Sequence, residues 1–243
     1  MKRVLLTICY DGTNYHGWQV QPNGLTVQEV LQNSLERLLG NRPDVTGCSR
    51  TDSGVHAREF CLHLDCNDNI PESAFIKGLN SILPDDISVL GVREVEKDFH
   101  ARYNAKGKTY IYGMYTGLNN PFLSRYFLRL EKEPDIEKMN AFCSKITGKH
   151  DFYGFSGSKR SVTDTVRTVK ECCVYRDDNK ILLKITADGF LYNMVRIIAG
   201  TALQVGYSEL RADCADDVFL KKDRSLAGKT LAPNGLFLEK VYY

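Results

Sequence analysis

One acidic side chain, Asp52, lies in a turn-forming sequence two residues after an arginine, Arg50. Residues 50–57 read Arg-Thr-Asp-Ser-Gly-Val-His-Ala, and apolar residues typical of short strands lie on both sides. Ser53 and Gly54 favour a tight turn, because glycine adopts positive φ without steric cost. A carboxylate on such a loop can serve as a nucleophile or a base, or it can hydrogen-bond its own backbone in an Asx-turn. The segment alone leaves both interpretations open.

A second charged residue, Arg196, lies in the middle of an apolar segment. Residues 190–200 read Phe-Leu-Tyr-Asn-Met-Val-Arg-Ile-Ile-Ala-Gly, which is apolar almost all round a helix and predicts burial. A buried guanidinium requires a charged partner, unless its long stem carries the head to the surface. If Asp52 is that partner, the ion pair keeps the carboxylate ionised and oriented, which suits a nucleophile or a base.

A third feature is a stretch without acidic residues. Residues 99–130 contain no Asp or Glu, and aromatic residues alternate with basic ones. The basic residues are Arg102, Lys106, Lys108, Arg125 and Arg129. Positive charge for phosphates and rings for bases are typical of a nucleic-acid surface. A tyrosine-rich strand with solvated lysines would show the same pattern.

The composition is that of a folded protein of 243 residues, with 43% hydrophobic and 10% aromatic residues and a formal net charge of +2. This length allows one large domain or two small ones, and the aromatic content excludes disorder. Eight cysteines are present without a Cys-x-x-Cys spacing, so we expect a reducing, cytoplasmic location. No apolar run is long enough to span a membrane. Any redox role of the adjacent Cys172 and Cys173 stays open.

The histidines show no metal-ligand spacing, so we expect no metal. A hydrolytic or metal enzyme that pairs Asp52 with His56 is an alternative. His56 follows Asp52 by four residues, but in a turn and strand, where the helical facing rule does not apply. Residues 154–159 resemble a phosphate loop faintly, but Lys159 is not part of a Gly-Lys-Ser/Thr ending. An RNA-contacting loop or a linker fits that segment better.

The hydrophobic patterns predict the same order of elements twice. In the first half they give strands near 4–10, 44–49, 59–65 and 87–95, with helices at 26–40 and 72–81. In the second half they give strands near 108–115, 166–175, 180–187 and 236–242, with helices near 135–147 and 190–205. This βαββαβ order predicts an α+β protein of two tandem ferredoxin-like halves, 1–104 and 105–243. Helices would cover one face of each antiparallel sheet, with an active-site cleft between the halves.

Five blocks of the sequence resemble one family, and they occur in that family's order. They are residues 10–28 (with Tyr-Asp-Gly-Thr, Gly-Trp-Gln and Thr-Val-Gln), 50–57, 99–112, 190–196 and 235–238. Together they make the chain similar to the tRNA pseudouridine synthase A family from residue 4 to the last predicted strand. A single Arg-Thr-Asp is weak evidence, whereas five ordered blocks along the whole chain favour the catalytic interpretation of Asp52.

The resemblance implies a homodimeric enzyme without a cofactor that converts uridine to pseudouridine at positions 38, 39 and 40 of the tRNA anticodon stem-loop. It implies that Asp52 is the essential carboxylate and that Arg196 pairs with it. Arg50 would enter the RNA helix in place of the flipped uridine, Tyr110 would stack on the flipped base, and Leu236 would form part of an apolar wall. The charge pattern adds candidate contacts to the RNA backbone, namely Arg102, Lys106, Lys108 and Arg125.

Some positions depart from the family pattern. Ser49 stands where the family usually has Gly, Asn193 where it commonly has His, and residues 232–234 are slightly shifted. These departures leave open a paralogue that acts on another RNA, such as ribosomal RNA. A non-catalytic RNA-binding module would also explain the basic and aromatic residues. It would not explain an acid beside the binding surface, because a carboxylate repels phosphate.

Overall fold

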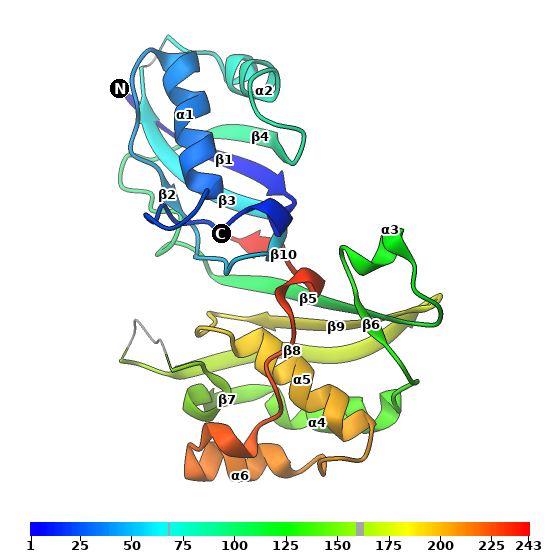
Figure 1. Ribbon diagram of the computed structural model, residues 1–243. Helices are drawn as coiled ribbons and strands as arrows, with labels where there is room; N and C mark the ends of the chain where they lie inside the picture. Colours follow the sequence, from blue (N-terminus) through cyan, green and yellow to red (C-terminus); the bar gives the residue numbers. More distant parts are fainter. Residues whose placement is uncertain (68, 159–162) are drawn as a thin grey trace. The chain divides into compact units, whose positions relative to one another are not determined.

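The computed structural model of the chain describes residues 1–67, 69–158 and 163–243 (Figure 1). Contacts between residues divide them into two units, Met1–Lys106 with Phe237–Tyr243, and Gly107–Leu236. Strands and helices occur in both units, so the predicted α+β class is confirmed. The division differs from the predicted halves, 1–104 and 105–243, at the carboxyl end, where the last strand belongs to the first unit.

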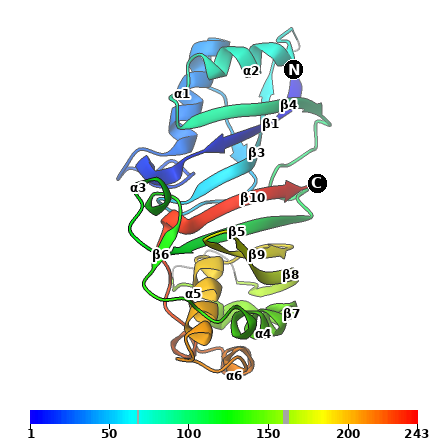
Figure 2. The same ribbon diagram turned by 90° about the vertical axis from the view of Figure 1, so that its right-hand side faces the viewer.

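The strands of the first unit form a sheet in the order β4–β1–β3–β10 (Figure 2). Their bounds are β1 (Lys2–Tyr10), β3 (His56–Cys66), β4 (Ile87–Val95) and β10 (Leu236–Tyr242), with the short β2 (Thr46–Gly47) paired to β3. β1 pairs antiparallel with β3 and β4, whereas β10 runs parallel to β3. Leu6 faces Leu62 across β1 and β3, and both are fully buried. Cross-strand apolar pairs of this kind stabilise the sheet and position its ends.

Two helices, α1 (Val27–Leu39) and α2 (Glu72–Asn80), pack in the first unit and lie on the same face of its sheet (Figure 1). Thr26 is the N-cap of α1, and its hydroxyl accepts a hydrogen bond from the Glu29 N–H at 3.4 Å. Gly40 ends the helix in the left-handed region, with φ of 77°. The start and the end that the sequence predicted for this helix are therefore confirmed.

The second unit has an antiparallel sheet in the order β5–β9–β8–β7. Its strands are β5 (Gly107–Thr116), β6 (Leu128–Leu130), β7 (Gly148–Asp151), β8 (Val166–Asp177) and β9 (Lys180–Ala187). Its α-helices are α3 (Pro121–Ser124), α4 (Ile136–Ile146), α5 (Met194–Gly206) and α6 (Cys214–Lys221). Single 3₁₀ turns occur at Gly12–Asn14 in the first unit and at Phe152–Phe155, Arg224–Leu226 and Pro233–Gly235 in the second. α4 packs against α5 and β8, which buries the apolar faces of both helices.

The sequence patterns missed the short elements α3, α6, β6 and β7. Each has eight residues or fewer, too few for an apolar period to show clearly. The helix predicted near 190–205 is also corrected, because α5 begins at Met194. Asn193 lies directly before it with φ of 60°, a left-handed conformation that a continuous helix does not allow. The apolar period runs through this break, so the sequence alone did not reveal it.

Among the described residues, no helix has the length and apolar character needed to cross a membrane. Within the same residues, no group of three or more His, Cys, Asp or Glu side chains is arranged to hold a metal ion. Cys172 is buried and Cys173 is half-buried, as opposite faces of β8 require. A hydrogen bond with Cys143 and burial both raise the pKa of the Cys172 thiol. Cys172 is therefore an apolar packing residue of the second unit.

His63 is a buried member of β3, between Leu62 and Leu64 in the sequence. Its side chain is 7% exposed, and its Nδ1 accepts a hydrogen bond from the Ala101 N–H at 3.0 Å. Burial, with the positive charge of Arg3, lowers the pKa of His63 to about 4. The neutral ring therefore stabilises the fold, and protonation favours the unfolded chain.

The lowered pKa of His63 makes stability depend on pH. The unfolded chain binds this proton below about pH 6.5, whereas the folded chain binds it only near pH 4. The free energy of unfolding should therefore fall as the pH is lowered from 6.5 to 4. His63→Asn, whose Oδ1 can accept the same hydrogen bond, should reduce this slope. Urea unfolding of both proteins at several pH values measures the effect, and an equal slope in the variant would contradict it.

Candidate active site

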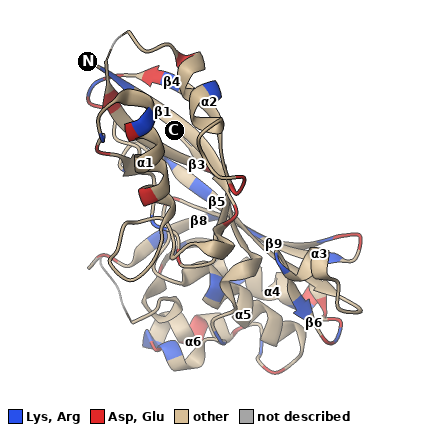
Figure 3. Ribbon diagram, turned by 45° about the horizontal axis from the view of Figure 1, so that its top comes forward, with Lys and Arg blue, Asp and Glu red and all other residues tan. Residues whose placement is uncertain are grey.

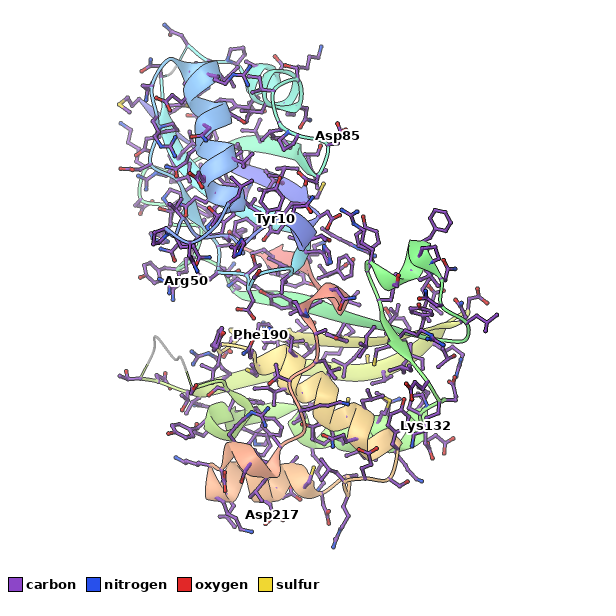
Figure 4. All side chains as sticks on the ribbon, viewed as in Figure 1. Tyr10, Arg50, Asp85, Lys132, Phe190 and Asp217 are labelled. Atoms are coloured by element: carbon purple, nitrogen blue, oxygen red, sulfur yellow. The ribbon has the colours of Figure 1, made fainter. Side chains whose placement is uncertain are left out.

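The turn that carries Asp52 links β2 to β3 in the first unit. The Val55 N–H donates to the Asp52 carbonyl at 3.2 Å, and Gly54 has φ of 76°, so the predicted tight turn is confirmed. Asp52 is half-buried and Arg50 is exposed, with Arg50 labelled on this loop in Figure 4. Thr51, between them, is buried. The turn thus carries a carboxylate, Asp52, and a positively charged guanidinium, Arg50, two residues apart on a short piece of backbone.

A second segment, residues 10–18, holds this turn, and we call it the clamp segment. The Tyr15 carbonyl accepts hydrogen bonds from the Gly54 N–H at 3.2 Å and from the Ser53 hydroxyl at 3.3 Å. The Trp18 N–H donates to the Thr51 carbonyl at 3.3 Å. The phenol oxygen of Tyr10, labelled in Figure 4, lies 2.9 Å from the Thr51 hydroxyl. The residues on both sides of Asp52 are therefore fixed by hydrogen bonds.

Two glycines allow the clamp segment to approach this closely. A Cβ at Gly12 would lie 2.0 Å from the Val55 carbonyl oxygen. A Cβ at Gly17 would lie 2.3 Å from the Thr51 carbonyl oxygen, and Gly17 has φ of 82°. Both positions belong to the first block of the family resemblance, and the structure gives the physical reason for glycine there. The sequence analysis did not foresee that this block touches the Asp52 turn.

His56 supports the same turn. It is 1% exposed, its Nδ1 accepts a hydrogen bond from the Gly12 N–H at 3.0 Å, and its ring stacks on Phe237 at 4.7 Å. The ring nitrogen that faces the clamp segment thus has a protein partner, the Gly12 N–H. Trp18 is likewise a packing residue, with its ring centroid 4.2 Å from that of Phe60 and the two rings tilted by 31°. His56 therefore acts here in the packing of the turn.

In the second unit, Tyr110 lies on β5 and is 6% exposed. Its ring meets the edge of Phe190 at a centroid distance of 4.9 Å and an angle of 78°. Phe190 lies just before α5 (Figure 4), so the edge-to-face pair restrains the tilt of the Tyr110 ring. Leu236, at the start of β10, is also 6% exposed and apolar. Both residues belong to the second unit, and their predicted roles toward a flipped base stay predictions.

Arg196 lies on α5, half-buried, and its guanidinium is held by groups that the sequence analysis missed. Nε donates to the Leu231 carbonyl at 2.7 Å, and Nη1 donates to Asn193 Oδ1 at 2.8 Å. Asn193 has a positive φ and lies directly before the start of α5, which places its side chain beside this guanidinium. Two hydrogen bonds from one planar group fix its orientation. The ion pair of Arg196 with Asp52, a residue of the other unit, stays a prediction.

Residues 227–235 form a strap over α5 and β5 that supports Arg196. The Gly228 N–H donates to the Thr201 hydroxyl at 2.8 Å, and the Tyr112 hydroxyl donates to the Ala232 carbonyl at 2.7 Å. Tyr112 is fully buried, and burial raises the pKa of its phenol, so it remains a donor. The Leu231 carbonyl that accepts from Arg196 thus belongs to a segment tied at both ends.

The predicted RNA-backbone residues differ in exposure. Arg102, Lys106 and Arg125 are exposed, whereas Lys108 is 8% exposed. Arg102 lies over the ring of Tyr103 at 5.8 Å, and Arg125 lies over Tyr126 at 5.7 Å. Figure 3 shows basic segments in blue beside α3 and in β6. The exposed residues are therefore accessible to a phosphate group, whereas Lys108 is largely covered, and the role of all four toward RNA stays a prediction. Lys159, in the faint phosphate-loop pattern, lies outside the described residues.

Comparisons with known proteins cover the whole chain. A family model described as tRNA pseudouridine synthase matches residues 7–104 and 142–243. The chain is 42% identical over 244 residues to tRNA pseudouridine synthase A 2 of Clostridium perfringens (strain 13 / Type A), with 100% of both chains covered. It is 44% identical over 248 residues to tRNA pseudouridine synthase A of Ruminiclostridium cellulolyticum, again with 100% of both chains covered. The similarity therefore includes both units, with the Asp52 turn, its clamp segment and the region around Arg196.

The clamp predicts that a side chain at Gly17 destabilises the protein. Gly17→Ala places a carbon 2.3 Å from the Thr51 carbonyl oxygen, at a φ that alanine rarely adopts. It should lower the free energy of unfolding by roughly 2–4 kcal/mol, as strain and overpacking do. Gly91→Ala is the matched control, because no atom lies within 4 Å of its added Cβ. Urea unfolding measures both, and equal stabilities would contradict the close approach.

Proposed function

The chain belongs to the tRNA pseudouridine synthase family, and on that premise we propose that it converts uridines 38, 39 and 40 of the tRNA anticodon stem-loop to pseudouridine. The chain is an RNA pseudouridine synthase, an isomerase. The observation that carries the proposal is the clamped Asp52 turn, which presents a carboxylate with fixed backbone on both sides.

The proposed chemistry follows from the balance of the reaction. The bond from the ribose C1′ to N1 of uracil breaks, the base turns, and C1′ bonds to C5, which loses its proton to N1 or solvent. Substrate and product have the same atoms and the same oxidation state, so one activated carboxylate suffices. Asp52 supplies it, as a nucleophile that attacks the nucleotide or as a base that removes a ribose proton. Arg196, as its partner, would keep the Asp52 carboxylate oriented.

A uridine within a stem must leave the base stack before it can react, at a cost of a few kcal/mol. We assign the capture of the flipped base to Tyr110, whose ring is oriented by Phe190. Arg50 is exposed on the catalytic loop and would fill the space that the base leaves in the RNA. Leu236 would form the apolar wall of the pocket. In this proposal Tyr110 and Leu236 would hold the base in apolar surroundings that exclude water.

Recognition of the RNA would proceed through its backbone and shape, since three neighbouring positions with different sequences must be accepted. The exposed Arg102, Lys106 and Arg125 supply positive charge for phosphate groups. We further propose that the protein acts in the cytoplasm as a homodimer, as the family resemblance implies. The departures at Ser49 and Asn193 favour testing ribosomal RNA beside tRNA as a substrate.

Tritium release from transcripts labelled at C5 of uridine tests the proposed function. The wild type should release tritium from the anticodon arm of tRNA. Asp52→Asn should slow release by at least about a hundredfold while RNA binding persists. Asp44→Asn, an exposed acid before the same loop, is the matched control and should release at the wild-type rate. Release from ribosomal RNA alone would replace the substrate, and no release from either RNA would favour a binding module.

The stacking role of Tyr110 predicts a graded series. Tyr110→Ala removes the ring, and stacking is worth about 1–3 kcal/mol per base, so kcat/KM should fall roughly 5- to 150-fold. Tyr110→Phe keeps the ring and its contact with Phe190, and it should retain most of the wild-type kcat/KM. Steady-state tritium release measures both variants. An equal loss of kcat/KM in Tyr110→Ala and Tyr110→Phe would assign the effect to the hydroxyl group and contradict stacking.

A further inference from the structure

Asp86 lies immediately before β4 and makes three hydrogen bonds to the clamp segment. Its carboxylate accepts from the Tyr15 hydroxyl at 2.5 Å and from the Asn14 amide at 3.3 Å. Its backbone carbonyl accepts from the Asp11 N–H at 2.9 Å. Figure 4 labels its neighbour Asp85 on the loop between α2 and β4. Asp86 therefore binds three residues of the clamp segment, Asp11, Asn14 and Tyr15.

Asp86 binds the clamp segment, and the clamp segment in turn binds the Asp52 turn. Tyr15 donates to Asp86 through its hydroxyl and accepts from Ser53 and Gly54 through its carbonyl. Tyr15 is 3% exposed, so the surrounding residues leave its ring little space to move. Burial and the neighbouring Asp86 raise the pKa of Tyr15, which keeps the phenol protonated as a donor. A continuous path of hydrogen bonds thus runs from Asp86 to the two residues that follow Asp52.

We propose that Asp86 is a positioning residue for the reaction, which sets the place of the Asp52 carboxylate through Tyr15. The inference rests on the proposed function, because it requires Asp52 to react with the substrate. Asp86 itself touches neither the Asp52 turn nor the substrate in this role. A displaced turn would leave RNA affinity intact and slow the chemical step, since misplacement of a reacting group by about 1 Å can reduce the rate about a hundredfold.

The test compares kcat, KM and stability for variants at both ends of the hydrogen bond. Asp86→Ala and Tyr15→Phe should each lower kcat about ten- to a hundredfold, with KM for tRNA within about threefold of wild type. The double variant should be no slower than the slower single variant, because both changes remove the same contact. Asp86→Asn keeps an oxygen that can accept from Tyr15, and it should recover part of kcat. Tyr15→Phe removes only a hydroxyl, so it serves if Asp86→Ala does not fold.

Asp65→Ala is the matched control. Asp65 lies near the far end of β3 from His56 and binds Arg3 through two hydrogen bonds of 2.8 Å. Its loss should lower stability and leave the kcat of the folded protein unchanged. Wild-type kcat in Asp86→Ala and Tyr15→Phe, beside an inactive Asp52→Asn, would overturn the inference and leave the proposed function in place. A wild type that releases no tritium from RNA would overturn both.

Discussion

The site depends on one close approach, that of the backbone of residues 12–17 to the backbone of the Asp52 turn. The approach leaves no room for a Cβ at Gly12 or Gly17. It brings the Tyr15 carbonyl within hydrogen-bond distance of two groups of the turn, and the Trp18 N–H within reach of a third. Backbone groups have few degrees of freedom, so the position of the carboxylate is set by rigid parts of the chain. The sheet of the first unit serves to keep these two segments in register.

In the second unit, hydrogen bonds to backbone groups likewise hold Arg196. A strap of backbone, residues 227–235, offers the Leu231 carbonyl to Arg196 and is tied to α5 and β5 by further hydrogen bonds. Asn193 adds a second acceptor, made possible by a left-handed backbone conformation before the helix. In both units, irregular segments that pack on regular ones hold the backbone or the side chain of a candidate site residue. This arrangement fits the general placement of reacting groups on loops held by a scaffold.

The proposed reaction explains why many contacts in the structure serve to hold the candidate site residues in place. An isomerisation that breaks and remakes one bond on the same nucleotide needs little chemical variety from the protein. It needs a carboxylate that meets an extruded base in one geometry, with water kept away. The packing of His56 on Phe237 and of Phe190 on Tyr110 restrains rings that would otherwise turn. Precision of placement, more than the number of reacting groups, is the property that these contacts supply.

Local patterns in the sequence determined the start and end of α1, the span of β4 and the turn at Gly54. Each depends on residues close together in the chain, whose backbone preferences and apolar alternation are encoded locally. The tertiary structure alone decided that β10 pairs with β3, that α5 begins after Asn193, and that Asp86 binds Tyr15 across 71 residues of sequence. An acid in a loop carries no local mark of its distant partner, because the folded core brings the two together. The candidate acid could therefore be named from the sequence, whereas the contacts that support its position could not.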